Sequence, residues 1–352
     1  MRIEEIRSRI LPADEEIMAL SKKRWMSIGK PLFSLGELET QITRISGIKK
    51  IVCYELKQKA LIVMCADNGI VEEGVTQTGQ EVTGIVADHF TRGETSACLM
   101  AQVAGVDVFP VDIGMASDVE TVTRETYKVA RGTCNFAKEP AMTEEQLWQA
   151  IRTGIRIAGE KKRQGYDILL TGEMGIGNTT TSSAVASVLL EQPPERVTGR
   201  GAGLDSRGLE RKIRVIREAI ARYELSREDV TDVMAKVGGY DIAGLCGLYL
   251  GGGIFRIPVV ADGFISAVAA LCAVRLVPAV KDYIIPSHMS GEPGARLVME
   301  ALDFSPLVTC GMSLGEGSGA VAAMPLLEMG LNVYRQMGSF EQIHVKQYEV
   351  LQ

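Results

Sequence analysis

Apolar runs that end in glycine or small polar residues recur along this 352-residue chain. Ala60 to Ala66 is continuously apolar and leads into Asp67-Asn68-Gly69, a pattern typical of a buried strand followed by a loop. The same pattern predicts strands within four later segments: 106–113, 166–170, 257–261 and 283–286. Helical stretches lie between them, including 144–163, 208–223 and 264–276.

Strands that alternate with helices predict an α/β fold built on a doubly wound, mainly parallel sheet. In such sheets, ligands bind beyond the carboxyl ends of the strands. Each glycine- or aspartate-rich cluster follows a predicted strand, so all of these clusters are expected to converge on one cleft.

The two ends of the chain have a different pattern. Residues 1–57 mix charged and apolar residues at helical spacing, with breaks at Pro12 and Pro31, and a helix is expected around 319–337. We therefore predict a large α/β domain over 58–304 that carries the active-site loops. Residues 1–57 and 305–352 are predicted to form a discontinuous small helical domain.

Composition and charge narrow the class of protein. Glycine accounts for 37 of the 352 residues, which is more than the usual share of about 7%. The excess falls in short clusters after apolar runs, where loops bind ligands. The net charge of −6, with both signs interspersed, gives no basic face for a nucleic acid. No apolar run approaches the ~20 residues that cross a membrane, so no membrane partner is expected.

The seven cysteines include no Cys-x-x-Cys pair and stand mostly in apolar surroundings. They are interpreted as reduced core thiols in a reducing compartment. The first residues contain no apolar signal-peptide segment. These features predict a cytoplasmic location.

The segment Ser313–Gly319 places one carboxylate, Glu316, among three glycines just before an apolar helical run. Such a loop presents a side chain to a ligand, because glycine allows close approach to the main chain. The alternative is an ordinary turn, with Glu316 in the positive field of a helix N-terminus.

A glycine-rich segment with Gly175, Gly177, Asn178 and Thr179 follows a predicted strand and opens a helix. Backbone N–H groups at a helix N-terminus suit an anion, and Asn178 or Thr179 is a natural N-cap. The spacing fits neither a dinucleotide fingerprint nor a P-loop. Phosphate or sugar binding and a structural tight turn both remain open.

A second glycine-rich loop contains Gly201 and Gly203 and precedes a helix that carries Lys212. A cation near a helix start gains nothing from the helix dipole, so a bound phosphate would explain Lys212. A solvated lysine is the alternative. Asp67-Asn68-Gly69 and Asp262-Gly263 are simple turns or ligand-binding loops, and their place after buried strands favours the second interpretation.

The three histidines are far apart and show no metal-ligand spacing, so no metal and no cofactor are expected. No nucleophile-elbow pattern indicates acyl transfer. Carboxylates and backbone amides remain as the reagents, which suits transfer at a sugar carbon.

Taken together, these segments resemble the nicotinate-nucleotide–dimethylbenzimidazole phosphoribosyltransferases, which make the lower-ligand nucleotide of cobalamin. The matching pieces occur in family order over roughly residues 30 to 338. They are Ser34-Leu35-Gly36, Cys65-Ala66-Asp67, Glu73-Gly74-Val75, Gly172-Glu173 through Thr180, Lys236-Val237-Gly238-Gly239, Asp262-Gly263-Phe264, Ile285-Pro286-Ser287-His288, Gly294-Ala295-Arg296 and Leu314 through Ala320.

The resemblance implies a Rossmann-like sheet, a small helical domain from both chain ends, a homodimer and a metal-free reaction. Nicotinate mononucleotide gives its phosphoribosyl group to an aromatic base, with inversion at the anomeric carbon. The family's base falls on Glu316, its second acidic residue on Glu173 and its phosphate-side lysine on Lys212. Other implied binding residues are Asp262, Gly263 and Ser290 near the nucleotide and nicotinate, and Thr78, Val86 and Leu314 around the acceptor.

Three positions depart from the family pattern: Asn68 replaces a histidine, Gly79 a proline and Val86 a glutamine. The change at Val86 removes a hydrogen-bond partner from the acceptor pocket. Alternatives are therefore the same transfer to phenol or p-cresol, or a structural partner subunit in a heterodimer with a paralogue. An oxidoreductase is disfavoured by the missing dinucleotide fingerprint.

Overall fold

The computed structural model describes residues 2–122 and 127–350. In these residues the centre is a five-stranded sheet with the order β2-β1-β3-β4-β5 and parallel neighbours throughout. The strands are β1 (Lys59–Ala66), β2 (Asp107–Gly114), β3 (Ile168–Met174), β4 (Val259–Ala261) and β5 (Ile284–Pro286). The predicted doubly wound sheet is confirmed. Its winding reverses between β1 and β3, where such sheets bind ligands.

Both faces of the sheet are buried, as the continuous apolar run of β1 requires. Alternate residues of a strand point to opposite faces, and β1 divides accordingly between two hydrophobic clusters. Residues 60, 62, 64 and 66 belong to one cluster, and residues 61, 63 and 65 to the other.

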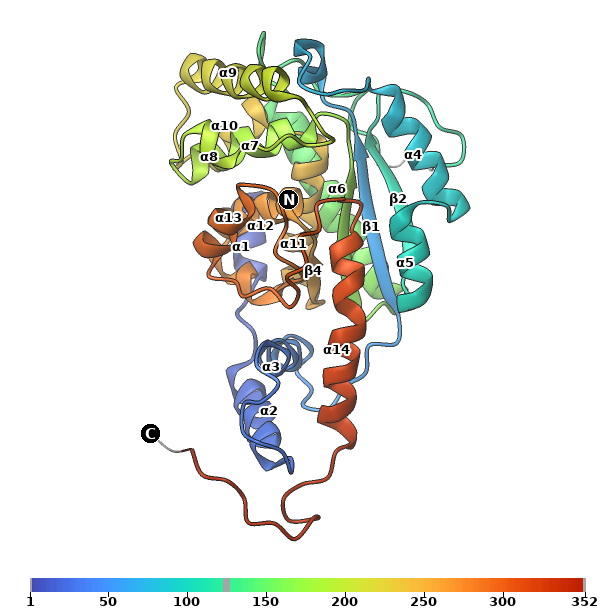
Figure 1. Cartoon of the computed structure of the whole chain (residues 1–352), viewed down its shortest axis with the longest axis vertical. Coiled ribbons are helices and arrows are strands. Elements are labelled where there is room, and N and C mark those ends of the chain that lie inside the picture. Colours follow the sequence, from blue (N-terminus) through green and yellow to red (C-terminus); the bar gives the residue numbers. More distant parts are fainter. Residues whose placement is uncertain (1, 123–126, 351–352) are drawn as a thin grey trace.

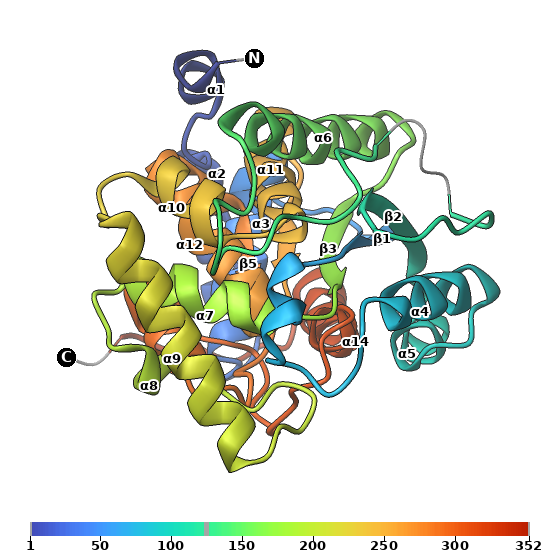
Figure 2. The ribbon, with the colours of Figure 1, turned by 90° about the horizontal axis from the view of Figure 1, so that it is seen from above.

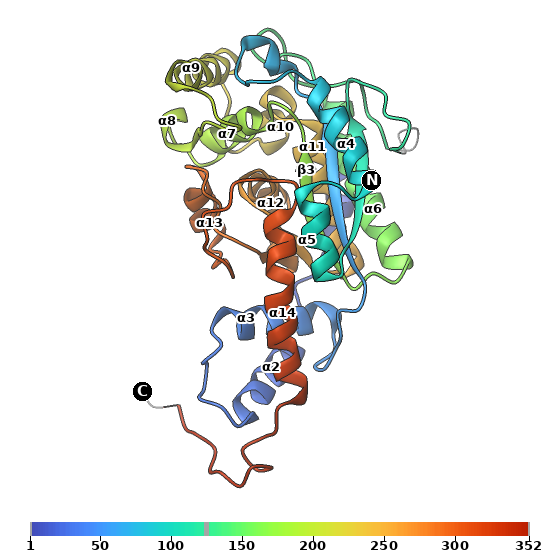
Figure 3. The ribbon, with the colours of Figure 1, turned by 45° about the vertical axis from the view of Figure 1, so that its right-hand side comes forward.

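Helices cover the two faces. The first cluster is built mainly with α1 (Ile3–Arg9), α6 (Glu144–Arg163), α7 (Asn178–Leu189), α8 (Pro194–Val197), α9 (Ser206–Tyr223), α10 (Val230–Val237), α11 (Tyr240–Phe255), α12 (Phe264–Leu276) and α13 (Ala295–Leu302). The second is built mainly with α2 (Glu15–Ser27), α3 (Glu37–Lys49), α4 (Glu81–Arg92), α5 (Ser96–Ala104) and α14 (Ser318–Gln336). Short 3-10 turns are η1 (Gly69–Glu73) and η2 (Pro278–Tyr283). Figure 3 shows α4 and α5 in front of β1, with α14 beside them.

Helix α14 runs from the middle of the molecule into its lower part (Figure 1). Its first residues lie near the carboxyl end of the sheet, and its lower half packs on α3. The Tyr334 hydroxyl donates to Ser21 Oγ of α2 at 2.9 Å, and its ring packs against Trp25 in a tilted arrangement with centroids 4.7 Å apart. Segments from both chain ends are therefore in contact.

Glycines in α6 and α11 show that the expectation of glycine in ligand-binding loops is only partly right. Part of the glycine excess serves helix packing and not ligand loops, because α6 and α11 cross in close contact. A Cβ atom on Gly154 would lie 2.5 Å from the backbone nitrogen of Leu248, and one on Gly247 would lie 2.8 Å from the carbonyl carbon of Ile151. Only a residue without a side chain allows this approach.

Other expectations have mixed outcomes. Helices α6 and α12 begin and end where the sequence predicted. Strand β3 runs on to Met174, so Gly172 and Glu173 are strand residues and not loop residues. All seven cysteines are free, but Cys53, Cys134 and Cys310 are exposed, so the prediction of core thiols is wrong for these three. No helix in the described residues is long and apolar enough to span a membrane.

Candidate active site

A cavity of about 240 Å³ opens at the carboxyl ends of the central strands. Ten of the predicted site residues line it: Glu173, Gly175, Asn178, Thr179, Gly201, Asp262, Gly263, Ser290, Leu314 and Glu316. They come from the ends of β3 and β4, the first glycine-rich turn and the start of α7, the second glycine-rich loop, the loop after β5 and the loop before α14. The convergence follows from parallel strands that all end at one edge of the sheet.

Glu316 occupies a left-handed backbone conformation with φ of 62°, between Gly315 and Gly317, whose φ values are 82° and 86°. A non-glycine residue in this region is strained, and such strain concentrates at functional sites. The carboxylate is half-buried, and its Oε2 lies 3.4 Å from the backbone nitrogen of Ala97 at the start of α5. Burial is the main cause that raises the pKa of Glu316, which suits a general base near neutral pH.

The backbone of Glu316 rests directly against strand β3. A Cβ atom on Gly172 would lie 2.7 Å from the carbonyl oxygen of Glu316, so this approach requires glycine. Figure 2 shows α14 end-on from this side, between α7 and the pair α4 and α5. Gly172, which stands in the segment that matches the family, is thus a strand residue that lets the loop before α14 approach β3.

Asp262 lines the cavity, but its oxygens are directed to the N-terminus of α14. Oδ1 accepts from the backbone N–H groups of Gly319 at 2.8 Å and Ala320 at 2.9 Å, and Oδ2 accepts from Gly317 at 3.2 Å. The side chain is 2% exposed. A buried carboxylate in the positive field of a helix start is well stabilised, so Asp262 anchors the turn that presents Glu316.

Glu173 lies at the end of β3, and its carboxylate accepts a hydrogen bond from the side-chain amide of Asn178. The same Nδ2 donates to Asp241 Oδ2 at 3.0 Å. The prediction that Asn178 or Thr179 caps α7 is wrong, because the N-cap is Gly177 in a left-handed conformation, with no side-chain cap. The Asn178 amide is committed to the two carboxyl groups instead.

Lys212 lies in the second turn of α9 and is fully buried. Its Nζ donates to Thr179 Oγ1 at 2.8 Å and to the carbonyl of Gly199 at 3.2 Å. Burial lowers the pKa of Lys212 to about 8, opposed by the nearby carboxylate of Glu292. The solvated-lysine alternative is therefore wrong, and a cation stands behind the two glycine-rich loops.

Five predicted residues do not line the cavity: Gly177, Gly203, Lys212, Thr78 and Val86. Gly177 directly precedes the lining residue Asn178, and Lys212 contacts the lining residue Thr179. The carbonyl of Gly203 accepts from Gln77 Nε2, so the loop with Thr78 lies against the second glycine-rich loop. Val86 is on α4, half-buried against the second hydrophobic cluster. The roles of Thr78 and Val86 stay predictions.

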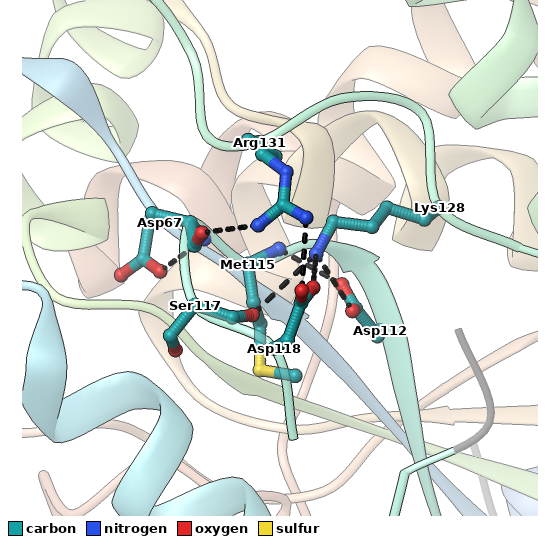
Figure 4. Close-up of polar contacts among 8 residues, drawn as sticks. Asp67, Asp112, Met115, Ser117, Asp118, Lys128 and Arg131 are labelled. Carbon is teal, nitrogen blue, oxygen red and sulfur yellow. Dashed lines mark hydrogen bonds and ion pairs between the residues drawn. The ribbon is translucent and has the colours of Figure 1, made fainter. Parts of the chain in front are cut away.

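Asp67 also lies outside the cavity lining, which contradicts the expectation that every cluster after a strand faces one cleft. Its Oδ2 accepts from the backbone of Ala116 at 2.8 Å, in a network at the ends of β1 and β2 (Figure 4). There Lys128 Nζ lies 3.1 Å from Asp112 Oδ2, and Arg131 pairs with Asp118 at 2.9 Å. These contacts fasten the chain after β2 across the sheet edge.

Sequence reasoning gave no role to three residues at or behind the cavity: Asp241, His288 and Glu292. His288 is 2% exposed, and its Nδ1 lies 3.1 Å from Ser287 Oγ and 4.0 Å from Asp262 Oδ1. Glu292 shares a loop with the predicted Ser290. Asp241 follows the matched pair Gly238-Gly239, which was the available signal. In the part of the chain that the structure describes, no group of three acidic, cysteine or histidine side chains could hold a metal ion.

Comparisons with known proteins decide the family. A family model described as Phosphoribosyltransferase matches residues 10–345. A nicotinate-nucleotide–dimethylbenzimidazole phosphoribosyltransferase of Acetivibrio thermocellus is 47% identical over 335 residues, covering 95% of both chains. This chain belongs to that family. A Clostridium acetobutylicum protein of the same name is 44% identical over the full length of both chains.

Solved structures agree with this family. The crystal structure of CobT from Thermus thermophilus superposes with a TM-score of 0.89 at 36% identity, covering 95% of this chain and 100% of that one. The resemblance and the fold class inferred from the sequence are thereby confirmed. The relatives' names state dimethylbenzimidazole as acceptor, so neither a phenolic acceptor nor a partner-subunit role is favoured.

Proposed function

We propose that this chain transfers the 5-phosphoribosyl group of nicotinate mononucleotide to 5,6-dimethylbenzimidazole, giving an α-riboside 5′-phosphate and nicotinate. The observation that carries the proposal is Glu316, a half-buried carboxylate held in a strained loop over the cavity of a phosphoribosyltransferase fold. The same proposal includes the homodimer that the resemblance implies, with the helical segments 1–57 and 305–352 as its small domain.

The reaction is a displacement at the anomeric carbon. The bond between C1′ and the pyridinium nitrogen breaks, and its electron pair leaves with nicotinate, which needs no proton because the pyridinium is already cationic. One ring nitrogen of the acceptor forms the new bond to C1′ from the opposite face. The acceptor's other ring nitrogen loses its proton to the carboxylate of Glu316.

The donor's phosphate fits the region between the two glycine-rich loops. Gly177 is the N-cap of helix α7 and no side chain caps this end, so the positive field of the helix N-terminus is open to an anion. Lys212 adds a buried cation that already contacts Thr179, a lining residue. Together these groups supply a charge-assisted phosphate site.

A product assay tests this function. Purified protein is incubated with nicotinate mononucleotide and one of several acceptors: 5,6-dimethylbenzimidazole, adenine or phenol. We expect an α-riboside phosphate to form fastest with the benzimidazole. No riboside with any acceptor would refute the proposal.

A further inference from the structure

Two buried carboxyl groups, one lining the cavity and one behind it, share one amide group. Glu173 is 6% exposed, Asn178 5% and Asp241 0%. Asn178 Nδ2 donates to Glu173 Oε2 and, at 3.0 Å, to Asp241 Oδ2. The three residues come from the end of β3, the start of α7 and the start of α11, so separate elements fix the arrangement.

The surroundings of the pair are acidic. In the described residues, no lysine, arginine or histidine forms an ion pair with Glu173 or Asp241. The negative charge of Asp262, at the end of β4, contributes to raising the pKa of Glu173. The charge of Asp67, at the end of β1, does the same for the pKa of Asp241. From the loop before α14, the backbone N–H of Glu316 is a further hydrogen-bond donor to Glu173. Two buried carboxylates without a cation do not both ionise, so the pair holds a proton.

The proton belongs on Glu173. Asp241 accepts a second hydrogen bond, from the backbone N–H of Ile242 at 2.9 Å, in the first turn of α11, where a negative charge is favoured. Burial raises the pKa of Asp241 to about 6. Burial, followed by the charge of Asp241, raises the pKa of Glu173 well above its ordinary value. Near neutral pH, Asp241 is therefore the anion and Glu173 the acid.

We propose that Asp241 is a positioning residue that keeps Glu173 protonated, so that Glu173 presents an O–H donor to the bound nucleotide. The inference rests on the proposed function for the identity of that nucleotide. A carboxylate beside an anomeric carbon can attack it and form a covalent intermediate, as in retaining glycosidases. A neutral acid does not, so the acceptor nitrogen remains the nucleophile and the anomeric carbon inverts once.

The shared proton is measurable without turnover. The C=O stretch of a protonated carboxyl group is recorded by infrared spectroscopy as a function of pH. Other buried carboxyl groups contribute bands, so the signal is the difference between the native protein and Glu173→Gln. We expect a Glu173 band at neutral pH. For Asp241→Asn, the Glu173 band is the difference between this variant and the double variant Asp241→Asn/Glu173→Gln. As pH rises, the band should disappear at a pH about 1–3 units lower than in the native protein, because the neighbouring charge is gone.

Controls separate this inference from the proposed function. Glu218→Gln changes an exposed carboxylate on α9 and should leave the band and turnover unchanged. At saturating donor, where weaker phosphate binding by neutral Lys212 does not limit the rate, turnover of the native enzyme should fall as pH rises and Glu173 ionises. This loss should be absent in Glu173→Gln, which keeps a neutral side chain. No Glu173 band at neutral pH, or a midpoint that Asp241→Asn does not move, would overturn the inference. An enzyme with the band but no transferase activity would refute only the proposed function.

Discussion

Glu316 combines three properties of a general base: partial burial, a raised pKa and a backbone fixed by neighbouring glycines. Glu316→Gln keeps the size of the side chain but cannot accept the acceptor's proton. We expect turnover to fall by a factor on the order of 10² or more, with donor affinity retained. Steady-state kinetics and a titration of nicotinate mononucleotide measure both quantities. Near-native turnover would end the assignment.

The raised pKa of Glu316 also predicts a pH dependence. A base must be ionised to act, so turnover should rise with pH through a value above the ordinary range of a glutamate. This acidic limb should be absent from the residual turnover of Glu316→Gln. A pH–rate profile at saturating substrates makes the comparison, and an identical limb in the variant would assign it to another group.

Lys212 is expected to hold the donor's phosphate. Lys212→Met removes the charge and keeps the buried chain, and we expect nicotinate mononucleotide to bind about 10–100-fold more weakly, since hydrogen bonds to charged groups contribute about 1.5–3 kcal/mol. Nicotinate riboside, which lacks the phosphate, should be little affected. Because the pKa of Lys212 is about 8 and the charged form binds phosphate, affinity should also fall as pH rises above that value. Calorimetric titration of both donors tests this, and equal losses for both would contradict it.

At the residue scale, the sequence was sufficient where chemistry follows a local pattern. Glu316 could be found because it stands among glycines just before an apolar helical run, and Glu173 because it follows Gly172 after an apolar run in a segment that matches the family. Asp241 was missed, although the matched pair Gly238-Gly239 stands just before it, since its partner Asn178 is 63 positions away in the chain. The N-cap prediction for Asn178 failed because its side-chain amide donates to Glu173 and Asp241 instead.

At the scale of elements, the N-terminus of α14 is the part that presents Glu316, the proposed base. Asp262 holds it through three backbone N–H groups, while the His288 ring occupies the space beside Gly319. The turn is therefore fixed before any ligand binds, as preorganised catalysis requires.

Asp262→Asn tests this anchoring. The variant loses the charge that three N–H groups share, so we expect the free energy of unfolding to fall by about 1.5–3 kcal/mol and turnover to fall at least about tenfold. Because Asp262 acts through Glu316, KM for the donor should change little. Denaturant unfolding and kinetics give the three quantities. A large rise in KM with unchanged turnover would instead indicate direct contact with the nucleotide.

The elements themselves were predictable to different degrees. The five strands follow apolar runs because both faces of the sheet are buried. The length of β3 was underestimated, because Gly172 and Glu173 resemble loop residues although they pair with Val63 and Met64 of β1. Helix α11 is buried on all sides, so it has no polar face to mark it in the sequence.

At the scale of the whole molecule, the helices from the chain ends are fastened to the α/β part by specific polar contacts. Arg256, after α11, donates to the carbonyls of Gly47 at 2.8 Å and Ile48 at 3.1 Å, at the end of α3, and to the Tyr283 hydroxyl at 2.9 Å. Lys49 pairs with Asp167 at 2.7 Å beside the same region. We expect the two parts to unfold together.

Arg256→Gln tests this coupling. Loss of its bonds should lower the free energy of unfolding by about 1.5–3 kcal/mol while the transition remains single. Arg214→Gln, at an exposed position on α9, is the control and should change it by less than about 0.5 kcal/mol. Calorimetry and denaturant unfolding measure both variants. Two separate transitions in the native protein would contradict the coupling.

The transfer itself is the most direct test of the proposed chemistry. Purified protein is supplied with nicotinate mononucleotide and 5,6-dimethylbenzimidazole, and nicotinate and riboside phosphate are quantified together. We predict equal amounts of nicotinate and the α-configured riboside 5′-phosphate, with both rates reduced on the order of 10²-fold or more by Glu316→Gln. Nicotinate release without riboside, a β-configured product, or no product at all would contradict it.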